Sequence, residues 1–260
     1  MLLQEIIDII ESVAPRRQQE AWDNSGLQVG NGNRDIHSVL LAVDVSETVV
    51  AEAIKEGCDM ILSHHPLLFH GLKQITGATP QERCVAEAIR HDIAIYSSHT
   101  SMDKALRGVS GRMAEQLGLQ EIRILVPSPE DSHVGLGVIG ILPKPMHWSG
   151  WLKHVQQVFG ADYVRYTPPV QPVISRVALC GGAGAEFIPD AIAAGADTYL
   201  SADMKYHDMQ AAAGQIMAVD IDHWVSEHFT CDIFAELLRG KVEVRTSQVD
   251  ASPIHVMLQN

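Results

Sequence analysis

The chain alternates between two hydrophobic periods. Near the N-terminus, apolar residues recur every three or four positions, which predicts an amphipathic helix over residues 2–13 that ends near Pro15. Farther along, short apolar runs typical of buried strands alternate with longer stretches of helical period. In the first half, the predicted strands cover residues 39–43, 60–62 and 93–96, and the predicted helices cover 46–56 and 79–91.

This order of strand, helix, strand, helix and strand predicts a parallel sheet with right-handed crossovers. The helix over 79–91 has clear start signals, with Thr79 as the cap, Pro80 in the first turn and Glu82 at the third helical position. Parallel strands end at the same edge of a sheet. We therefore expect the residues after 60–62 and after 93–96 to meet at that edge.

A similar rhythm fills the rest of the chain. The predicted helices there cover 110–117, 148–159, 187–194, 206–213 and 222–239, and the predicted strands cover 122–126, 134–142, 163–166, 177–180, 198–201, 216–219, 242–245 and 254–258. Prolines and acids at 127–132 mark a boundary. We expect an α/β fold of two subdomains with mixed or parallel sheets flanked by helices. The first subdomain would contain residues 1–126 and 216–260, and the second would contain 127–215.

Composition narrows the class of protein. The chain has 260 residues, 46% of them hydrophobic, which suits an ordinary globular protein. No apolar run reaches the roughly 20 residues of a membrane span, and the first residues lack the basic start of a secretory signal. A cytoplasmic location is therefore expected. The four cysteines form no C-x-x-C pair, so they are expected to be reduced core residues.

Charge bears on the choice of partner. The net charge of −13 argues against nucleic acid as the main partner, because binding to a phosphate backbone depends on clustered Lys and Arg. The net charge does not exclude a local basic patch.

Adjacent histidines, His64 and His65, follow the strand at 60–62, and Pro66 closes the run. Histidine is a common ligand of transition metals. Neighbouring side chains on a strand point to opposite faces, so the two rings can share one ion only if the backbone turns sharply between them. Two ions would remove this difficulty. The next strand is followed by His99 and Asp103, which adds a nitrogen and an oxygen ligand to the same edge.

A second group of candidate ligands lies in the other half of the chain. His223 and Glu227 are four residues apart at the start of the predicted long helix, so they share one face. A solvated face or a salt bridge would give the same spacing. Just upstream, Asp203, Lys205 and His207 follow the strand at 198–201. The placement of all these groups at strand ends, or at the helix start that follows, favours a metal site.

A glycine-rich run at 181–184 follows a strand and precedes a helix. Its backbone N–H groups could hold a phosphate, or it could form a tight turn. Phe187 stands where the third glycine of a dinucleotide fingerprint belongs, and no G-K-[ST] follows.

Together these motifs resemble the Nif-three-like proteins, which are also named GTP cyclohydrolase 1 type 2 homologues. The matching segments are residues 22–27, 63–67, 99–103, 181–184 and 205–207, with His223 and Glu227. The resemblance implies a dinuclear metal centre and a ring-shaped homohexamer, with the metal site at the carboxyl ends of the strands between the two subdomains. Ala202 departs from the family pattern, which usually has glycine before Asp203, so the shape of that loop is open.

The resemblance also assigns ligands. It implies that His64 and Asp103 hold one ion, that His65 and His223 hold the other, and that Glu227 bridges them. Three histidines and two carboxylates suit divalent zinc, iron, manganese or nickel better than magnesium or calcium.

We expect hydrolysis of a small phosphorylated or nucleotide-like substrate, because two cations activate a water molecule and bind an oxyanion. His99 or His207 would transfer protons, and Lys205 would stabilise negative charge. The family name suggests GTP, but no residue specifies guanine. The alternatives are a non-enzymatic metal-handling protein and a ring that encloses nucleic acid.

Overall fold

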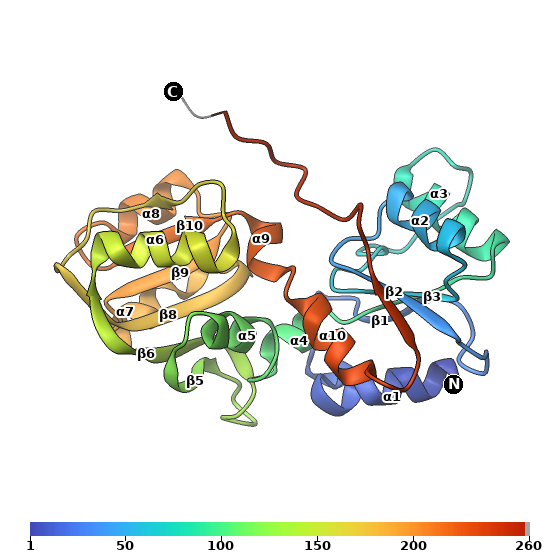
Figure 1. The fold of residues 1–260 in the computed structure, drawn as a ribbon, viewed down its shortest axis with the longest axis horizontal. Helices are drawn as coiled ribbons and strands as arrows, with labels where there is room; N and C mark the ends of the chain where they lie inside the picture. The colour runs from blue at the N-terminus through green and yellow to red at the C-terminus, as the bar shows by residue number, and fades with distance from the viewer. Residues whose placement is uncertain (258–260) are drawn as a thin grey trace. The chain divides into compact units, whose positions relative to one another are not determined.

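The computed structural model describes residues 1–257 of the chain, which pack as two α/β units (Figure 1). The first unit contains residues 1–102 and 230–251. The second contains residues 103–229 and 252–257. Residues 103–126 and 216–229 thus pack within the second unit.

The first unit is built on a five-stranded sheet of order β1-β4-β3-β2-β11. Its strands are β1 (Gly26–Val29), β2 (Ser38–Ala42), β3 (Met60–Ser63), β4 (Ala94–Ser97) and β11 (Glu243–Thr246). The four strands from β4 to β11 are parallel, and β1 adds to the edge in antiparallel fashion. The predicted parallel arrangement of the three early strands is therefore confirmed.

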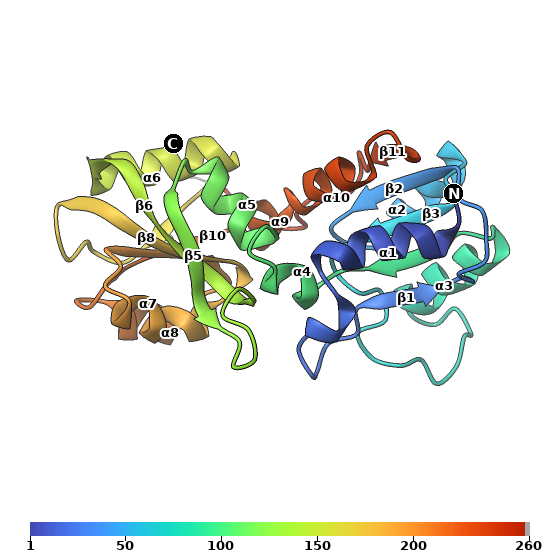
Figure 2. The same ribbon diagram turned by 90° about the horizontal axis from the view of Figure 1, so that it is seen from below.

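Helices cover both faces of this sheet (Figures 1 and 2). The helices of the first unit are α1 (Leu3–Val13), α2 (Glu47–Glu56), α3 (Pro80–Arg90) and α10 (Thr230–Leu238), with a short 3-10 turn at Arg16–Gln18 and the start of α4 (Thr100–Lys104). Helices α2 and α3 pack on one face through a core that includes Leu40 and Ile61 of the sheet. Thr79 caps α3 as predicted, because its side chain accepts a hydrogen bond from the Glu82 N–H at 3.2 Å.

The second unit has a six-stranded mixed sheet of order β5-β6-β8-β9-β10-β7. Its strands are β5 (Gln120–Pro127), β6 (Gly135–His147), β7 (Arg165–Tyr166), β8 (Val173–Ala183), β9 (Thr198–Ala202) and β10 (Met217–Ile221). Its helices are α5 (Val109–Gln116), α6 (Trp148–Phe159), α7 (Ile188–Ala193), α8 (Tyr206–Ala212) and α9 (His223–Glu227), with a 3-10 turn at Ala185–Phe187. Helices α5 and α6 bury Met113 and Trp151 against one face, and α7 and α8 bury Ala191 and Ala212 against the other (Figure 2).

The structure corrects three predicted elements. Part of the segment expected to be a loop at 22–30 forms strand β1. The single helix predicted over 222–239 is wrong, because α9 ends at Glu227 and α10 starts at Thr230. The strand predicted over 254–258 is wrong for residues 254–257, which form no strand in the described part of the chain. Residue 258 lies outside that part.

The break between α9 and α10 follows from where the flanking residues pack. Phe229 contacts Phe159 in the second unit, with ring centroids 5.8 Å apart. Phe234, one turn into α10, is fully buried in the first unit. The helical pattern is therefore interrupted where the chain leaves one core and enters the other.

Two expectations about composition can be compared with this fold. All four cysteines are buried and reduced, as expected. Along residues 1–257, no helix has the length and apolar character needed to cross a membrane.

Candidate metal centre

Three histidines of the first unit meet at the carboxyl edge of its sheet. His64 and His65 follow β3, and His99 follows β4. Their ring centroids lie 5.0 to 5.3 Å apart. One ring nitrogen from each lies within 4.8 Å of the others, so the three could hold a metal ion. The expectation that the ends of these two strands meet is confirmed for these side chains.

Each ring is held through its Nδ1 atom. His64 Nδ1 lies 3.0 Å from the main-chain carbonyl of Ser98. His65 Nδ1 lies 2.9 Å from Asp44 Oδ1, and His99 Nδ1 lies 2.8 Å from Asp23 Oδ1. Carbonyl and carboxylate oxygens only accept hydrogen bonds, so each Nδ1 is the donor and the lone pair of the neutral ring is on Nε2. This is how metal-binding histidines are commonly oriented.

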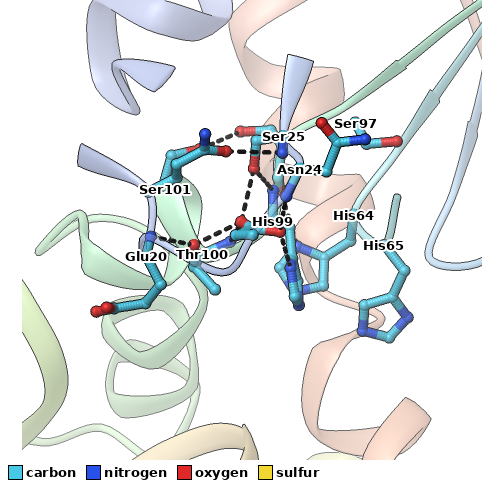
Figure 3. Close-up of polar contacts among 12 residues, drawn as sticks. Glu20, Asn24, Ser25, His64, His65, Ser97, His99, Thr100 and Ser101 are labelled. Carbon is cyan, nitrogen blue, oxygen red and sulfur yellow. Dashed lines mark hydrogen bonds and ion pairs between the residues drawn. The ribbon is translucent and has the colours of Figure 1, made fainter. Parts of the chain in front are cut away.

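Asp23 organises the surroundings of His99. Its side chain is fully buried and also accepts hydrogen bonds from Ser25 Oγ and from both the N–H and the hydroxyl of Thr100. Burial alone would raise the pKa of Asp23, but the hydrogen bonds from His99 and Thr100 outweigh it and hold the pKa well below its usual range. Figure 3 shows His99 within this network, with His64 and His65 beside it. The carboxylate therefore stays ionised and fixes the ring.

The adjacent histidines do not point to opposite faces. Their rings are tilted by 41° with centroids 5.0 Å apart, so both reach the same neighbourhood. The Ser63 hydroxyl donates to the main-chain carbonyl of His65 at 2.8 Å and also bonds Ser97 Oγ at 2.7 Å, which ties this bend to β4. The geometry of the first unit allows one ion held by three histidines as well as separate ions.

The second unit supplies a histidine and a carboxylate. His223 is the first residue of α9 and Glu227 lies one turn later, with His223 Nε2 3.0 Å from Glu227 Oε2. Glu227 is only 4% exposed, which excludes the solvated-face interpretation for this residue. His223 Nδ1 lies 2.7 Å from Asp203 Oδ2, so its orientation is fixed in the same way as those of His65 and His99.

The loop after β9 gives Asp203 this position. Ala202 is fully buried at the end of β9, and Asp203 adopts a left-handed backbone with φ of +55°. Asp is among the residues that visit this region most readily. The loop can therefore form with alanine at 202, because the left-handed turn is made at Asp203 and not at the residue before it.

The glycine-rich run makes room for Glu227. The N–H groups of Gly181, Gly182 and Gly184 donate to the hydroxyls of Ser110, Ser226 and Ser201 respectively. These N–H groups are therefore bonded within the protein, which disfavours the phosphate interpretation. Gly182 has φ of +64°, and a Cβ atom there would lie 2.2 Å from Glu227 Oε1. The glycine is needed for the close approach of this carboxylate.

The remaining predicted residues lie in the second unit. Asp103 lies in α4 and is partly buried. Burial, and then the charge of Asp103 with a smaller effect of Glu227, raises the pKa of the Cys180 thiol to about 12. Lys205 and His207 are exposed at the start of α8, where His207 Nδ1 lies 3.3 Å from Gln210 Oε1. Their catalytic roles stay predictions.

The sequence prediction missed the carboxylates that orient the rings. Asp44 follows β2 at the same edge as the histidines, so its position after a strand was an available signal. Asp23 contacts a histidine 76 residues away, and no local pattern indicates that contact. Asp203 was singled out without this role.

Comparison with known proteins places the chain in a family. A protein from Streptococcus pneumoniae named "GTP cyclohydrolase 1 type 2 homolog" is 34% identical over 266 residues, covering 98% of this chain and 99% of that protein. A Clostridium perfringens protein of the same name is 36% identical over 230 residues, covering 87% of each.

Solved structures agree with the fold. The crystal structure of a Bacillus cereus protein related to NIF3 is similar with a TM-score of 0.90 at 25% identity, covering 99% of both chains. Reduced HcgD from Methanocaldococcus jannaschii gives 0.80 at 28% identity, covering 95% of this chain and 97% of that one. The family model described as Duf34/NIF3 (NGG1p interacting factor 3) matches residues 1–253. The chain therefore belongs to the DUF34/NIF3 family.

Proposed function

We propose that this protein is a metal-dependent hydrolase that binds two divalent transition-metal ions and acts on a small phosphorylated or nucleotide-like substrate. The proposal is supported by one shared feature of four histidines, His64, His65, His99 and His223. Each donates from Nδ1 to a carboxylate or a carbonyl, which leaves Nε2 as the ring nitrogen that can face a metal ion; at His223, Nε2 lies beside Glu227 Oε2, the other proposed ligand. Histidines that only fill a core do not need this common orientation.

The proposed ligands are those that the family resemblance implies. His64 and Asp103 would hold one ion, His65 and His223 the other, and Glu227 would bridge them. Within the second unit, the 3.0 Å separation of His223 Nε2 from Glu227 Oε2 and the missing Cβ at Gly182 both fit a carboxylate held for this purpose. Imidazole with carboxylate suits zinc, iron, manganese or nickel.

The chain's own residues would perform the remaining chemistry. Two bound cations would lower the pKa of a water molecule and stabilise negative charge on the substrate. His99, whose Nδ1 is fixed by Asp23, can accept or give a proton at Nε2. His207 is the second candidate for proton transfer. Lys205, which is exposed beside it, would bind negative charge on the substrate.

The test is elemental analysis of protein purified without chelator, followed on the same sample by turnover assays with phosphoesters, nucleotides and cyclic amides. We expect two ions per chain. Glu227→Ala should lose both metal and turnover, whereas Glu130→Ala, which removes an exposed acid from a loop, should change neither. Retention of both ions in Glu227→Ala would refute the ligand assignment.

The stoichiometry separates the possible sites. One ion per chain that is lost in His99→Ala would favour a three-histidine site. Two exchangeable ions without turnover of any compound would favour a metal-handling protein. The homohexameric ring, which the family resemblance implies, remains part of the proposal, and light scattering would test it. The cytoplasmic location, expected from the sequence, is proposed as well.

A further inference from the structure

Two large aromatic side chains of the first unit are exposed beside the histidine cluster. Trp22 is 61% exposed and Phe69 is 40% exposed. They stack on each other with ring centroids 5.8 Å apart and an interplanar angle of 24°. His99 presents its ring edge-on to both, at 6.0 Å from Trp22 and 5.7 Å from Phe69. Single exposed apolar residues are ordinary, but a stacked pair against a candidate active-site histidine is not.

Hydrogen bonds link the backbone segments that carry the two rings. The side chain of Asn24 donates to the main-chain carbonyl of Leu68 at 2.5 Å, and the Leu68 N–H donates to Gln28 Oε1 at 3.0 Å. These two bonds join the loop that bears Trp22, and strand β1 directly after it, to the loop that bears Phe69. Asp23, next to Trp22, is buried, and its carboxylate accepts the hydrogen bond that holds His99. The aromatic pair is therefore held in place before any ligand arrives, which lowers the entropy cost of binding.

The geometry of the pair limits what can bind. A centroid separation of 5.8 Å lies within the range of direct aromatic contact, so a third ring would extend the stack from an outer face rather than enter between the two rings. An aromatic face attracts flat π-systems whatever their substituents. Proteins that bind single-stranded nucleic acids use this property to stack bases of every kind. A phosphate has no π-system and a sugar ring is not a flat one, so a compound without a heterocycle gains no base stacking from this pair.

We propose that Trp22 and Phe69 form a stacking subsite that takes the flat nitrogen-containing ring of the substrate and sets that ring beside His99. This inference rests on the proposed function for the reaction that follows, but ring binding can be measured without turnover. It narrows the substrate class from small phosphorylated compounds to those that carry a planar heterocycle. The compact pair, bordered by histidine, suits one small ring better than a protein surface.

The test compares two probes that share a sugar and a phosphate and differ by one ring: adenosine 5′-monophosphate and ribose 5-phosphate. Calorimetry on the full chain, with and without added Mn²⁺, gives the dissociation constant of each. We expect the wild-type protein to bind the ring-bearing probe at least about tenfold more tightly, a preference that corresponds to the usual strength of base stacking. Trp22→Ala and Phe69→Ala should each reduce this preference, with ribose 5-phosphate affinity unchanged.

Two further variants make the result specific. Trp22→Phe retains a flat ring and should recover most of the preference. Tyr166→Ala removes another exposed aromatic that packs against a tryptophan, Trp148, in the second unit, and it should leave the preference at its wild-type value. Thermal unfolding of each variant identifies any loss of folding; because Trp22 is largely exposed, little loss is expected.

Equal affinities of the wild-type protein for the two probes would overturn the inference. A preference that survives in both Trp22→Ala and Phe69→Ala would overturn it as well. If Trp22→Ala instead changes the oligomeric state in light scattering while the ring preference stays, the pair is a subunit contact and the inference is wrong. Failure of the proposed function looks different, since metal or turnover would be missing while the ring preference remains.

Discussion

Gly182 offers a sharp test of how the second unit positions Glu227. A Cβ atom at this residue would lie 2.2 Å from Glu227 Oε1 and 3.3 Å from His223 Nε2. The first distance is more than about 1 Å inside ordinary van der Waals contact. In Gly182→Ala the carboxylate must therefore move by about this amount, and the histidine beside it is also crowded.

The expected loss of stability in Gly182→Ala has two parts, which a control variant separates. An alanine forced into the left-handed region costs about 1–2 kcal/mol, whatever surrounds it. Gly160 has nearly the same φ, +63° against +64° at Gly182, and a Cβ atom added there would meet no atom within 4 Å. Gly160→Ala thus measures the backbone cost alone, at about 2–4 °C of melting temperature per kcal/mol. Gly182→Ala adds an overpacking cost of about 1–3 kcal/mol.

Metal affinity gives the decisive measurement. Gly182→Ala should bind Zn²⁺ or Mn²⁺ about 10–100-fold more weakly than the wild-type protein, as is typical when the support of a ligand is disturbed. Gly160→Ala should bind the metal normally. Titration calorimetry at pH 7.5 with matched thermal unfolding measures both quantities. Normal metal affinity in Gly182→Ala would refute the argument that this glycine makes room for a ligand.

Three further outcomes are expected. Asp203→Asn should weaken metal binding about 10–100-fold with little change in melting temperature, because the carboxylate is half-exposed and acts by orienting His223; a variant that binds metal normally would contradict this role. The thiols should resist Ellman's reagent at pH 8 in the native protein and react together once it is unfolded, because burial raises the pKa of Cys84 to about 11 and of Cys180 to about 12; rapid labelling of the native protein would argue against it. Glu82→Gln should lower stability at neutral pH, because hydrogen bonds from the Thr76 hydroxyl and N–H and from the Ala78 N–H hold the pKa of Glu82 below its usual 4.5. The stability that Glu82 contributes is present above pH 4.5 and is lost as the pH falls through its lower folded value, so acid unfolding curves of variant and wild type should converge there; a constant gap would contradict the assignment.

Much of the first sheet could be predicted because its central strands are continuous apolar runs in chain order. Strand β1 could not, since residues 22–26 have turn composition and β1 exists only through antiparallel pairing with β4. The break between α9 and α10 also left no local signal, because neither glycine nor proline lies between Asp222 and Arg239. It reflects a change of packing partner rather than a change of propensity.

In the candidate site, too, some contacts could be predicted from the sequence and others could not. The meeting of His64 and His99 follows from parallel strand ends, which the hydrophobic pattern defines. The contact between Asp203 and His223 depends on the register of β9 against β10 and on a left-handed residue, and neither can be derived from spacing. The function of Gly182 was equally hidden, because the side chain it accommodates belongs to Glu227, far downstream in the sequence.

The loop that contains Asp23 also limits how the specificity of the protein could change, in evolution or by engineering. Trp22 faces solvent while its neighbour Asp23 is buried and fixes His99, so two adjacent residues serve different tasks through one short stretch of backbone. Exchanging the whole loop would alter ring recognition and the orientation of His99 together. Substituting only the exposed position, with Asp23 and Ser25 retained, is the route by which a new ring preference could arise without loss of the histidine's orientation.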